Sequence, residues 1–359
     1  MKIGILSMQK ICNYGSFLQA LSLKREFESR GNEVYFIDIE KGRQIVEPAV
    51  SRRSIVSKLD KYFFKRIKNY FMIRQMNVVH ISSQREFLHT DKKLQADERF
   101  DLAVIGSDEV FNATTPSGWG FSRQLFGEIS NADRVVTYAA SCGSTDLDGV
   151  RAYGIDGEIR ECLDKVEEIS VRDRNTYEFV HKLTGREPMI NLDPVFLANY
   201  DEFIPQSKPK KPYMLIYAYP NRICAPEEIK VIKAYAKKHG LRIVSVGMQQ
   251  RWCSHNYVAN AFELLRYFKD AACVVTDTFH GTVFSIKYNK RFVALIRESN
   301  RNKLGGLLKQ FGLYDRHVES VNDFESIMES DVNFTDVNKI IANEQESSAR
   351  YFDRLCGIL

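Results

Sequence analysis

The segment from Thr276 to Thr282 combines the residue types best suited to chemistry on an anion, and it reads Thr-Asp-Thr-Phe-His-Gly-Thr. It follows the apolar run 271–276, which predicts a strand, and precedes a helical stretch. A helix that begins here would place His280, Gly281 and Thr282 where free N–H groups and the helix dipole favour a bound anion. Because histidine titrates near neutral pH, His280 could hold a phosphate or donate a proton. It could also simply pack against its own helix.

Arg172 stands at the end of the run 168–171, which predicts another short strand. A guanidinium at the carboxyl end of a strand is well suited to gripping a carboxylate through two parallel hydrogen bonds. An ion pair with Asp173 or Glu178 on the surface is the other interpretation that the sequence allows.

Two further turns place polar groups after predicted strands. Asn13 could cap the helix after the first strand, while Gly15 and Ser16 could offer a backbone and a hydroxyl to an anion. Asp108 follows the apolar strand 102–105 and could orient or deprotonate a sugar hydroxyl, or it could be an ordinary turn residue. The first strand is not followed by the glycine pattern of a dinucleotide site or a P-loop.

The elements that must position these residues alternate between strand and helix along the chain. Apolar runs predict strands at 2–7, 34–39, 102–105, 135–139 and 168–171, and then at 213–218, 241–246, 272–276 and 292–296. Such alternation predicts parallel sheets with helices on both faces. The sequence therefore predicts an α/β protein with two doubly wound, Rossmann-like domains that face a central cleft, with ligands at the carboxyl ends of the strands.

The predicted domains differ in their expected tasks. Residues 1–199 form the N-terminal domain, on the acceptor side, and residues 213–340 form the C-terminal domain, on the donor side. Residues 200–212 contain three prolines and are the predicted linker. Residues 341–359 predict a C-terminal helix that could pack back on the N-terminal domain, and residues 51–95 predict a basic helical insertion.

The basic insertion has a marked local charge. Residues 51–74 carry eight Lys and Arg against one Asp, a local charge of +7 in a chain whose net charge is +5. The segment could lie on an anionic membrane and reach a lipid-linked oligosaccharide acceptor. Alternatively, its aromatic face could pack on the N-terminal domain and leave the lysines in solvent. One basic segment without a recognised binding module does not favour nucleic acid as a partner.

The composition excludes several classes of protein. Hydrophobic residues make up 44% and charged residues 27% of the 359 residues, an ordinary globular balance. No apolar run approaches the roughly 18 residues that span a bilayer, and the first residues resemble a strand rather than a signal peptide. We therefore expect a cytoplasmic protein. The seven cysteines are scattered without a C-x-x-C pair, so we expect reduced thiols and neither a metal site nor another cofactor.

Six segments, taken together and in their order along the chain, resemble the polysaccharide pyruvyl transferase family. They are Asn13–Ala20, Gly106–Asn112, Tyr138–Gly143, Ser170–Asp173, Asp193–Leu197 and Thr276–Ser285. The resemblance implies a fold like that of the two-domain GT-B glycosyltransferases. It also implies transfer of a pyruvyl group from phosphoenolpyruvate to a pair of sugar hydroxyls in a surface or capsular polysaccharide precursor, giving a cyclic ketal and phosphate.

The same resemblance implies roles for particular residues. Arg172 and His280 match the family's Ser-Val-Arg and His-Gly positions, so both should contact the donor. Lys303 stands where the family commonly has arginine, and Glu109 and Phe111 stand where it usually has Gln and Trp. The donor-binding residues expected on this basis and from their positions after strands are Asn13, Gly15, Ser16, Ser141, Arg172, His280, Gly281, Thr282, Arg301 and Lys303.

Phosphoenolpyruvate carries a carboxylate and a phosphate, so its site needs cations, a general acid and a base. We assign Arg172 to the carboxylate, His280 to the phosphate or to protonation of the donor, and Asp108 to the acceptor hydroxyl. The mechanism as drawn requires no metal. Two alternatives stay open: a glycosyltransferase of the same fold that uses a nucleotide sugar, and a sugar-binding protein that has lost catalysis.

Overall fold

The protein consists of two compact α/β units. The computed structural model describes residues 1–46, 63–91, 94, 98–206 and 211–358. Unit 1 comprises Met1–Pro194 together with Arg350–Leu359, and unit 2 comprises Val195–Ala349. Each unit contains a parallel sheet with helices packed on it, so the predicted α/β class with two Rossmann-like units is confirmed.

The sheet of unit 1 has the strand order β2-β1-β3-β4-β5-β6, and its neighbouring strands pair in parallel. The strands are β1 (Lys2–Leu6), β2 (Glu33–Phe36), β3 (Phe100–Asp108), β4 (Ala132–Ala140), β5 (Ser170–Val171) and β6 (Met189–Ile190). Ile5 of β1 lies opposite Val104 of β3, and both are fully buried. Strands covered on both faces have nearly continuous apolar sequences, which is why these two were predictable.

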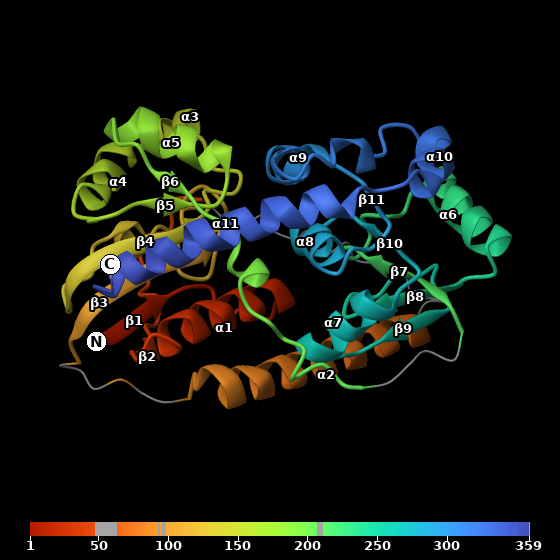
Figure 1. Cartoon of the computed structure of the whole chain (residues 1–359), viewed down its shortest axis with the longest axis horizontal. Helices are drawn as coiled ribbons and strands as arrows, with labels where there is room; N and C mark the ends of the chain where they lie inside the picture. The colour runs from red at the N-terminus through yellow and green to blue at the C-terminus, as the bar shows by residue number, and fades with distance from the viewer. Residues whose placement is uncertain (47–62, 92–93, 95–97, 207–210, 359) are drawn as a thin grey trace. The chain divides into compact units, whose positions relative to one another are not determined.

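Helices connect and cover these strands (Figure 1). They are α1 (Tyr14–Glu28), α2 (Phe63–Leu88), α3 (Leu147–Ala152), α4 (Asp156–Leu163) and α5 (Arg174–Thr184). The helix α1 packs on β1, β2 and β3, whereas α5 packs on β5 and β6. The helix α2 lies within the predicted insertion at 51–95, of which residues 51–62, 92, 93 and 95 lie outside the described residues.

The sheet of unit 2 has the strand order β11-β10-β7-β8-β9, again with parallel neighbours. Its strands are β7 (Tyr213–Tyr217), β8 (Arg242–Val246), β9 (His255–Tyr257), β10 (Cys273–Thr276) and β11 (Phe292–Ala294). Its helices are α6 (Pro226–Lys238), α7 (Ala261–Asp270), α8 (Phe279–Lys287), α9 (Arg301–Gln310), α10 (Phe324–Glu329) and most of α11 (Phe334–Leu355). In the described residues, no helix is long and apolar enough to cross a membrane.

The C-terminal helix begins earlier than predicted, at Phe334. Its last residues belong to unit 1, where Tyr351 Oη donates a hydrogen bond to the carbonyl oxygen of Thr137 at 2.8 Å. The ring of Phe352 stacks on that of Tyr138 with centroids 4.5 Å apart.

The chain passes from unit 1 to unit 2 after Pro194, ahead of the predicted linker at 200–212. Tyr200 and Ile204 are 1% and 6% exposed and belong to unit 2, because these apolar side chains pack into it. Residues 207–210 of the predicted linker lie outside the described residues.

Candidate active-site residues in the two units

Both sheets contain a point where the strand order reverses. In unit 1 the chain forms β1 and β2 and then places β3 on the other side of β1. In unit 2 it forms β7, β8 and β9 and then places β10 on the other side of β7. Open parallel sheets bind ligands beyond the carboxyl ends of strands at such a point. Asn13 lies in the turn after β1, Asp108 is the last residue of β3, and the predicted segment at Asp277–Thr282 follows β10.

The two polar turns of unit 1 meet at the start of α1. Asn13 is the N-cap, and its Oδ1 accepts hydrogen bonds from the N–H groups of Gly15 at 2.8 Å and Ser16 at 3.4 Å. The predicted cap is therefore present, and it uses the backbone N–H of Gly15 that the sequence suggested for an anion. The Ser16 hydroxyl donates to Asp108 Oδ2 at 2.5 Å, which joins the two turns.

Asp108 is half-buried at the carboxyl end of β3, with a left-handed φ of 77°. An aspartate tolerates this conformation better than most residues because its short side chain can bond locally. Its Oδ1 accepts a hydrogen bond from the N–H of Glu109 at 2.9 Å, so both carboxylate oxygens are held. Glu109 Oε2 in turn accepts a hydrogen bond from Asn112 at 2.8 Å, and a Cβ on Gly143 would lie 2.5 Å from that oxygen.

Arg172 follows β5 and is 4% exposed. Its Nη1 lies 3.3 Å from Asp193 Oδ2, and Gln19 Nε2 donates to the same oxygen at 2.7 Å. Burial by itself would lower the pKa of Arg172, but the carboxylates of Asp193, Asp108, Asp173 and Glu109 raise it above its usual value. The alternative of a surface ion pair with Asp173 or Glu178 is thus wrong, because the guanidinium is buried and pairs with Asp193.

Ser141 contributes a hydroxyl beside this cluster. Its Oγ donates to Asp173 Oδ2 at 2.8 Å and accepts a hydrogen bond from the N–H of Gly143 at 3.2 Å. Asp173 is the N-cap of α5 through its other oxygen, which accepts from the N–H of Thr176 at 2.8 Å. The cluster in unit 1 is therefore rich in carboxylates and hydroxyls, groups that bind sugar hydroxyls readily.

In unit 2, Thr278 is the N-cap of α8. Its Oγ1 accepts a hydrogen bond from the N–H of Gly281 at 2.9 Å, and its carbonyl oxygen accepts from the N–H of Thr282 at 3.1 Å. The two residues that we predicted as anion donors thus use these N–H groups within the helix start. Gly281 also has a packing role, because a Cβ there would lie 2.1 Å from Thr276 Oγ1 and 2.6 Å from Thr278 Oγ1.

His280 is the second residue of α8 and is partly exposed. The centroid of its ring lies 5.3 Å from that of Phe279 and 5.9 Å from that of Phe284. The imidazole therefore packs against its own helix, which is one of the two interpretations that the sequence allows, and its Nε2 is buried although the residue as a whole is partly exposed.

Asp277, directly after β10, lies in the predicted segment but had no predicted role of its own. It is fully buried, its Oδ1 accepts a hydrogen bond from the N–H of Tyr219 at 3.1 Å, and its Oδ2 lies 3.6 Å from Arg222 Nη1. Burial raises the pKa of Asp277 to about 6, although Arg222 opposes this shift. Asn300 Nδ2 donates to the carbonyl oxygen of Asp277 at 2.7 Å, which fixes the backbone as well.

The structure places the remaining predicted cations in α9. Arg301 is exposed and lines a cavity of about 400 Å³ together with Arg297 and His317. The lining of that cavity includes neither His280 nor Asp277. Lys303 is half-buried two residues further along α9.

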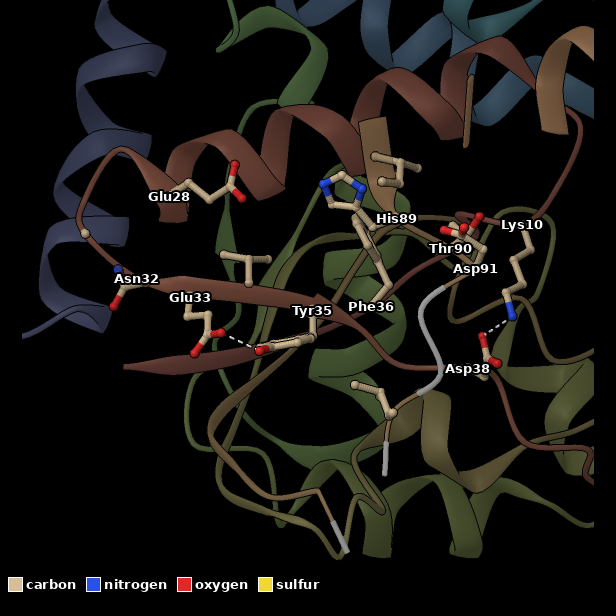
Figure 2. A pocket seen from close by; sticks show the side chains of 14 residues that line it. Lys10, Glu28, Asn32, Glu33, Tyr35, Phe36, Asp38, His89, Thr90 and Asp91 are labelled. Atoms are coloured by element: carbon tan, nitrogen blue, oxygen red, sulfur yellow. Dashed lines mark hydrogen bonds and ion pairs between the residues drawn. The ribbon is translucent and has the colours of Figure 1, made fainter. Parts of the chain in front are cut away.

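A larger cavity, of about 930 Å³, lies in unit 1 along the edge strand β2. Figure 2 shows its polar lining, including the ion pair between Lys10 and Asp38. None of the residues predicted for catalysis or donor binding lines it. The cavity therefore carries no argument for the reaction.

Several residues of these clusters escaped the sequence-based prediction of the site. Gln19 and Asp193 lie within segments that carry the family resemblance, so that signal could have identified them. Arg222 lies in the loop after β7 and has no such signal. Its position after the first strand of unit 2 corresponds to that of Asn13 in unit 1, which only the strand order reveals.

Comparison with known proteins agrees with this architecture. A family model described as polysaccharide pyruvyl transferase matches residues 13–299. A comparison with curated protein sequences found no match. Among solved structures, Arabidopsis thaliana UGT89C1 complexed with quercetin is 10% identical with a TM-score of 0.51, over 99% of this chain and 98% of that chain. The same protein complexed with UDP gives 11% identity and a TM-score of 0.50 over the same shares. Such neighbours are GT-B glycosyltransferases, and at this identity they show the GT-B fold alone.

Proposed function

We propose that this chain, which belongs to the polysaccharide pyruvyl transferase family, moves the pyruvyl group of phosphoenolpyruvate onto two hydroxyls of one sugar. The product is a cyclic ketal on a surface or capsular polysaccharide precursor, and phosphate is released. One observation carries the proposal: the family match over residues 13–299 spans the polar residues at or just after the carboxyl ends of β1, β3, β5 and β10. Membership alone implies a transferase with a sugar acceptor, and the donor is the part that we add.

The reaction requires proton transfers and charge stabilisation. Addition of a proton to the methylene carbon of phosphoenolpyruvate makes the neighbouring carbon oxocarbenium-like, and a first sugar hydroxyl attacks it while losing its own proton to a base. Phosphate leaves with the electrons of its bond to that carbon. A second hydroxyl then attacks the same carbon, loses its proton and closes the ketal. The protein must therefore supply an acid, a base and partners for two anionic groups.

Asp108 is our candidate for the base on the acceptor side. Ser16 holds one of its oxygens and the N–H of Glu109 holds the other, so the carboxylate has a fixed orientation. A carboxylate held in this way is prepared to accept a proton from a sugar hydroxyl brought against it.

Arg172 and His280 are our candidates for the donor. Asp193 fixes the buried guanidinium of Arg172, and Gln19 fixes Asp193, so the cation is preorganised for the donor's carboxylate. His280, at the start of α8, is assigned to the phosphate or to the proton donated to the methylene carbon.

The choice of donor is tested directly with purified protein. Phosphoenolpyruvate and a set of nucleotide sugars are supplied separately with the same panel of lipid-linked and free oligosaccharide acceptors. We expect phosphate release from phosphoenolpyruvate and a gain of a pyruvyl ketal on an acceptor, detected by mass spectrometry. Consumption of a nucleotide sugar without consumption of phosphoenolpyruvate would instead identify an ordinary glycosyltransferase of this fold. Consumption of neither donor would favour a sugar-binding protein.

We further propose that the enzyme works at the cytoplasmic face of a membrane that holds a lipid-linked acceptor. The helix α2 supports this because it exposes large apolar side chains: Ile73 is 49%, Val78 is 61% and Ile81 is 42% exposed. Arg74 is exposed on the same helix, and the segment 51–74 has a charge of +7. Apolar and basic side chains together favour an anionic bilayer surface.

A further inference from the structure

Two loops meet beyond the carboxyl edge of the sheet in unit 2. The loop after β7 carries Tyr219 and Arg222, and the turn after β10 carries Asp277. The strands β7 and β10 are neighbours at the point where the strand order reverses. This is the position at which open parallel sheets bind their ligands, so the side chains that converge there are candidates for ligand contacts.

The Arg222 guanidinium is held from two sides. Its Nη1 lies 3.6 Å from Asp277 Oδ2, and its central carbon lies 4.8 Å from the centroid of the Tyr219 ring. The side chain nevertheless keeps 36% of its surface exposed, whereas Asp277 has none. A guanidinium that lies between a carboxylate and an aromatic face, and is still open to solvent, is well suited to bind a phosphate.

The backbone that carries Arg222 is fixed as well. Arg297 Nη2 donates to the carbonyl oxygen of Arg222 at 3.1 Å, and Glu228 binds the same guanidinium through both oxygens, at 2.6 and 3.1 Å. Gln250 Nε2 donates to the carbonyl oxygen of Ala218 at 2.7 Å. The charge of Arg297 is thus committed to Glu228, and its role is to hold the loop in place.

We propose that Arg222 binds the phosphate group of the donor at the carboxyl edge of the unit 2 sheet, with Asp277 as its positioning residue. The identity of the donor rests on the proposed function, but phosphate binding by Arg222 does not. The proposal adds a cation to Arg301 and Lys303, the two in α9 that the sequence predicts at the donor; Arg301 lines a cavity whose lining does not include Arg222. It also gives Asp277 a reason to be a buried carboxylate, since burying one without such a partner is costly.

The test compares Arg222→Gln with Arg291→Gln, in the full-length chain. Arg291 is a matched control because its side chain is 40% exposed and pairs with Asp331 at 3.3 Å. It directly precedes β11, so it lies at the amino ends of the strands of the same sheet, away from the carboxyl ends where Arg222 lies. Calorimetric titration with inorganic phosphate and with phosphoenolpyruvate gives the affinities independently of turnover. We expect Arg222→Gln to weaken both at least about tenfold and Arg291→Gln to leave both unchanged.

Two further variants separate binding from folding. Arg222→Lys retains the charge without the planar fork and should recover part of the affinity. Asp277→Asn should raise the KM for the donor several-fold with a smaller effect on kcat, because only the placement of Arg222 is lost.

Equal phosphate affinity in Arg222→Gln and the unaltered protein, or no phosphate binding by the unaltered protein, overturns the proposal. Phosphate binding that depends on Arg222 without any turnover of phosphoenolpyruvate would leave the site in place and reject the proposed reaction.

Discussion

Arg172 Nη1 lies 3.3 Å from Asp193 Oδ2, and both side chains are almost completely buried. Removal of one partner of a buried ion pair leaves an uncompensated charge, at a cost of about 3–5 kcal/mol. We therefore expect Asp193→Asn to lower the free energy of unfolding by about that amount, as measured by urea denaturation. Asp133→Asn is the control, because Asp133 pairs with Arg99 on the exposed surface and should cost less than about 1 kcal/mol. Equal effects of the two substitutions would contradict the role of burial.

Gly281 has no room for a side chain at the start of α8. A Cβ at this position would lie 2.1 Å from Thr276 Oγ1, so Gly281→Ala should destabilise the protein by about 1–3 kcal/mol. Gly306→Ala provides the opposite case, since Gly306 lies inside α9 and a Cβ there would meet no atom within 4 Å. That substitution should stabilise the protein by about 0.4–1 kcal/mol. Thermal unfolding measures both changes in stability. If both substitutions stabilise the protein, Gly281 is not tightly packed against Thr276.

The sequence predicted the fold well where apolar residues run continuously. The strand β3 is recognisable because Leu102–Ile105 is buried on both faces, whereas the polar edge strand β9 at His255–Tyr257 gave no such signal. The burial of Tyr200 and Ile204 in unit 2 was also not predictable, because the prolines near them indicated a linker.

The sequence predicted individual residues of the candidate site but not the contacts between them. Asp108 and Ser16 were each identified from their place after a strand, but their contact joins residues 92 positions apart and depends on β1 and β3 being neighbours. Arg222 was missed for the same reason, since nothing near it in the sequence indicates that β10 will bring Asp277 beside it. Pairwise contacts between distant loops are set by strand order, which periodicity does not reveal.

The pKa of Asp277 makes a prediction about stability and pH. Burial raises this pKa to about 6, although the charges of Arg222 and Arg297 oppose the shift. The pKa of an aspartate in an unfolded chain is about 4. Since the folded chain holds the proton more tightly, the contribution to stability is complete below about pH 4 and is lost as the pH rises through about 6. Asp277→Asn resembles the protonated form and should avoid this loss.

The measurement is urea unfolding at pH 5 and pH 7.5, followed by Trp252 fluorescence in a Trp119→Phe background so that unit 2 is observed alone. The free energy of unfolding of Asp277→Asn, measured relative to that of the unaltered protein, should rise by about 1–3 kcal/mol from pH 5 to pH 7.5. The fully exposed Asp331 provides the control substitution Asp331→Asn, which should show no such change. A pH-independent difference for Asp277→Asn would mean that its carboxylate titrates normally.

The exposed apolar side chains of α2 predict binding to anionic vesicles. The double substitution Val78→Ser and Ile81→Ser should reduce the bound fraction several-fold in a co-sedimentation assay with phosphatidylserine-containing vesicles, because buried apolar area is lost. Tyr153→Ser removes a side chain that is 45% exposed elsewhere in unit 1 and should have no effect. Added salt should weaken binding of the unaltered protein through the basic segment. Equal binding to uncharged vesicles at every salt concentration would remove the electrostatic part of the proposal.

His280 is the candidate whose two roles can be separated kinetically. A general acid contributes about a hundredfold or more to the rate, so His280→Ala should lower kcat by at least that factor. His280→Gln can still donate a hydrogen bond but cannot transfer a proton in the same way, and it should be as slow as the alanine variant. His239→Ala is the control, because His239 caps the far end of α6 and pairs with Glu329. If glutamine restores turnover and alanine mainly raises the KM for phosphoenolpyruvate, His280 holds the phosphate and the acid is another group.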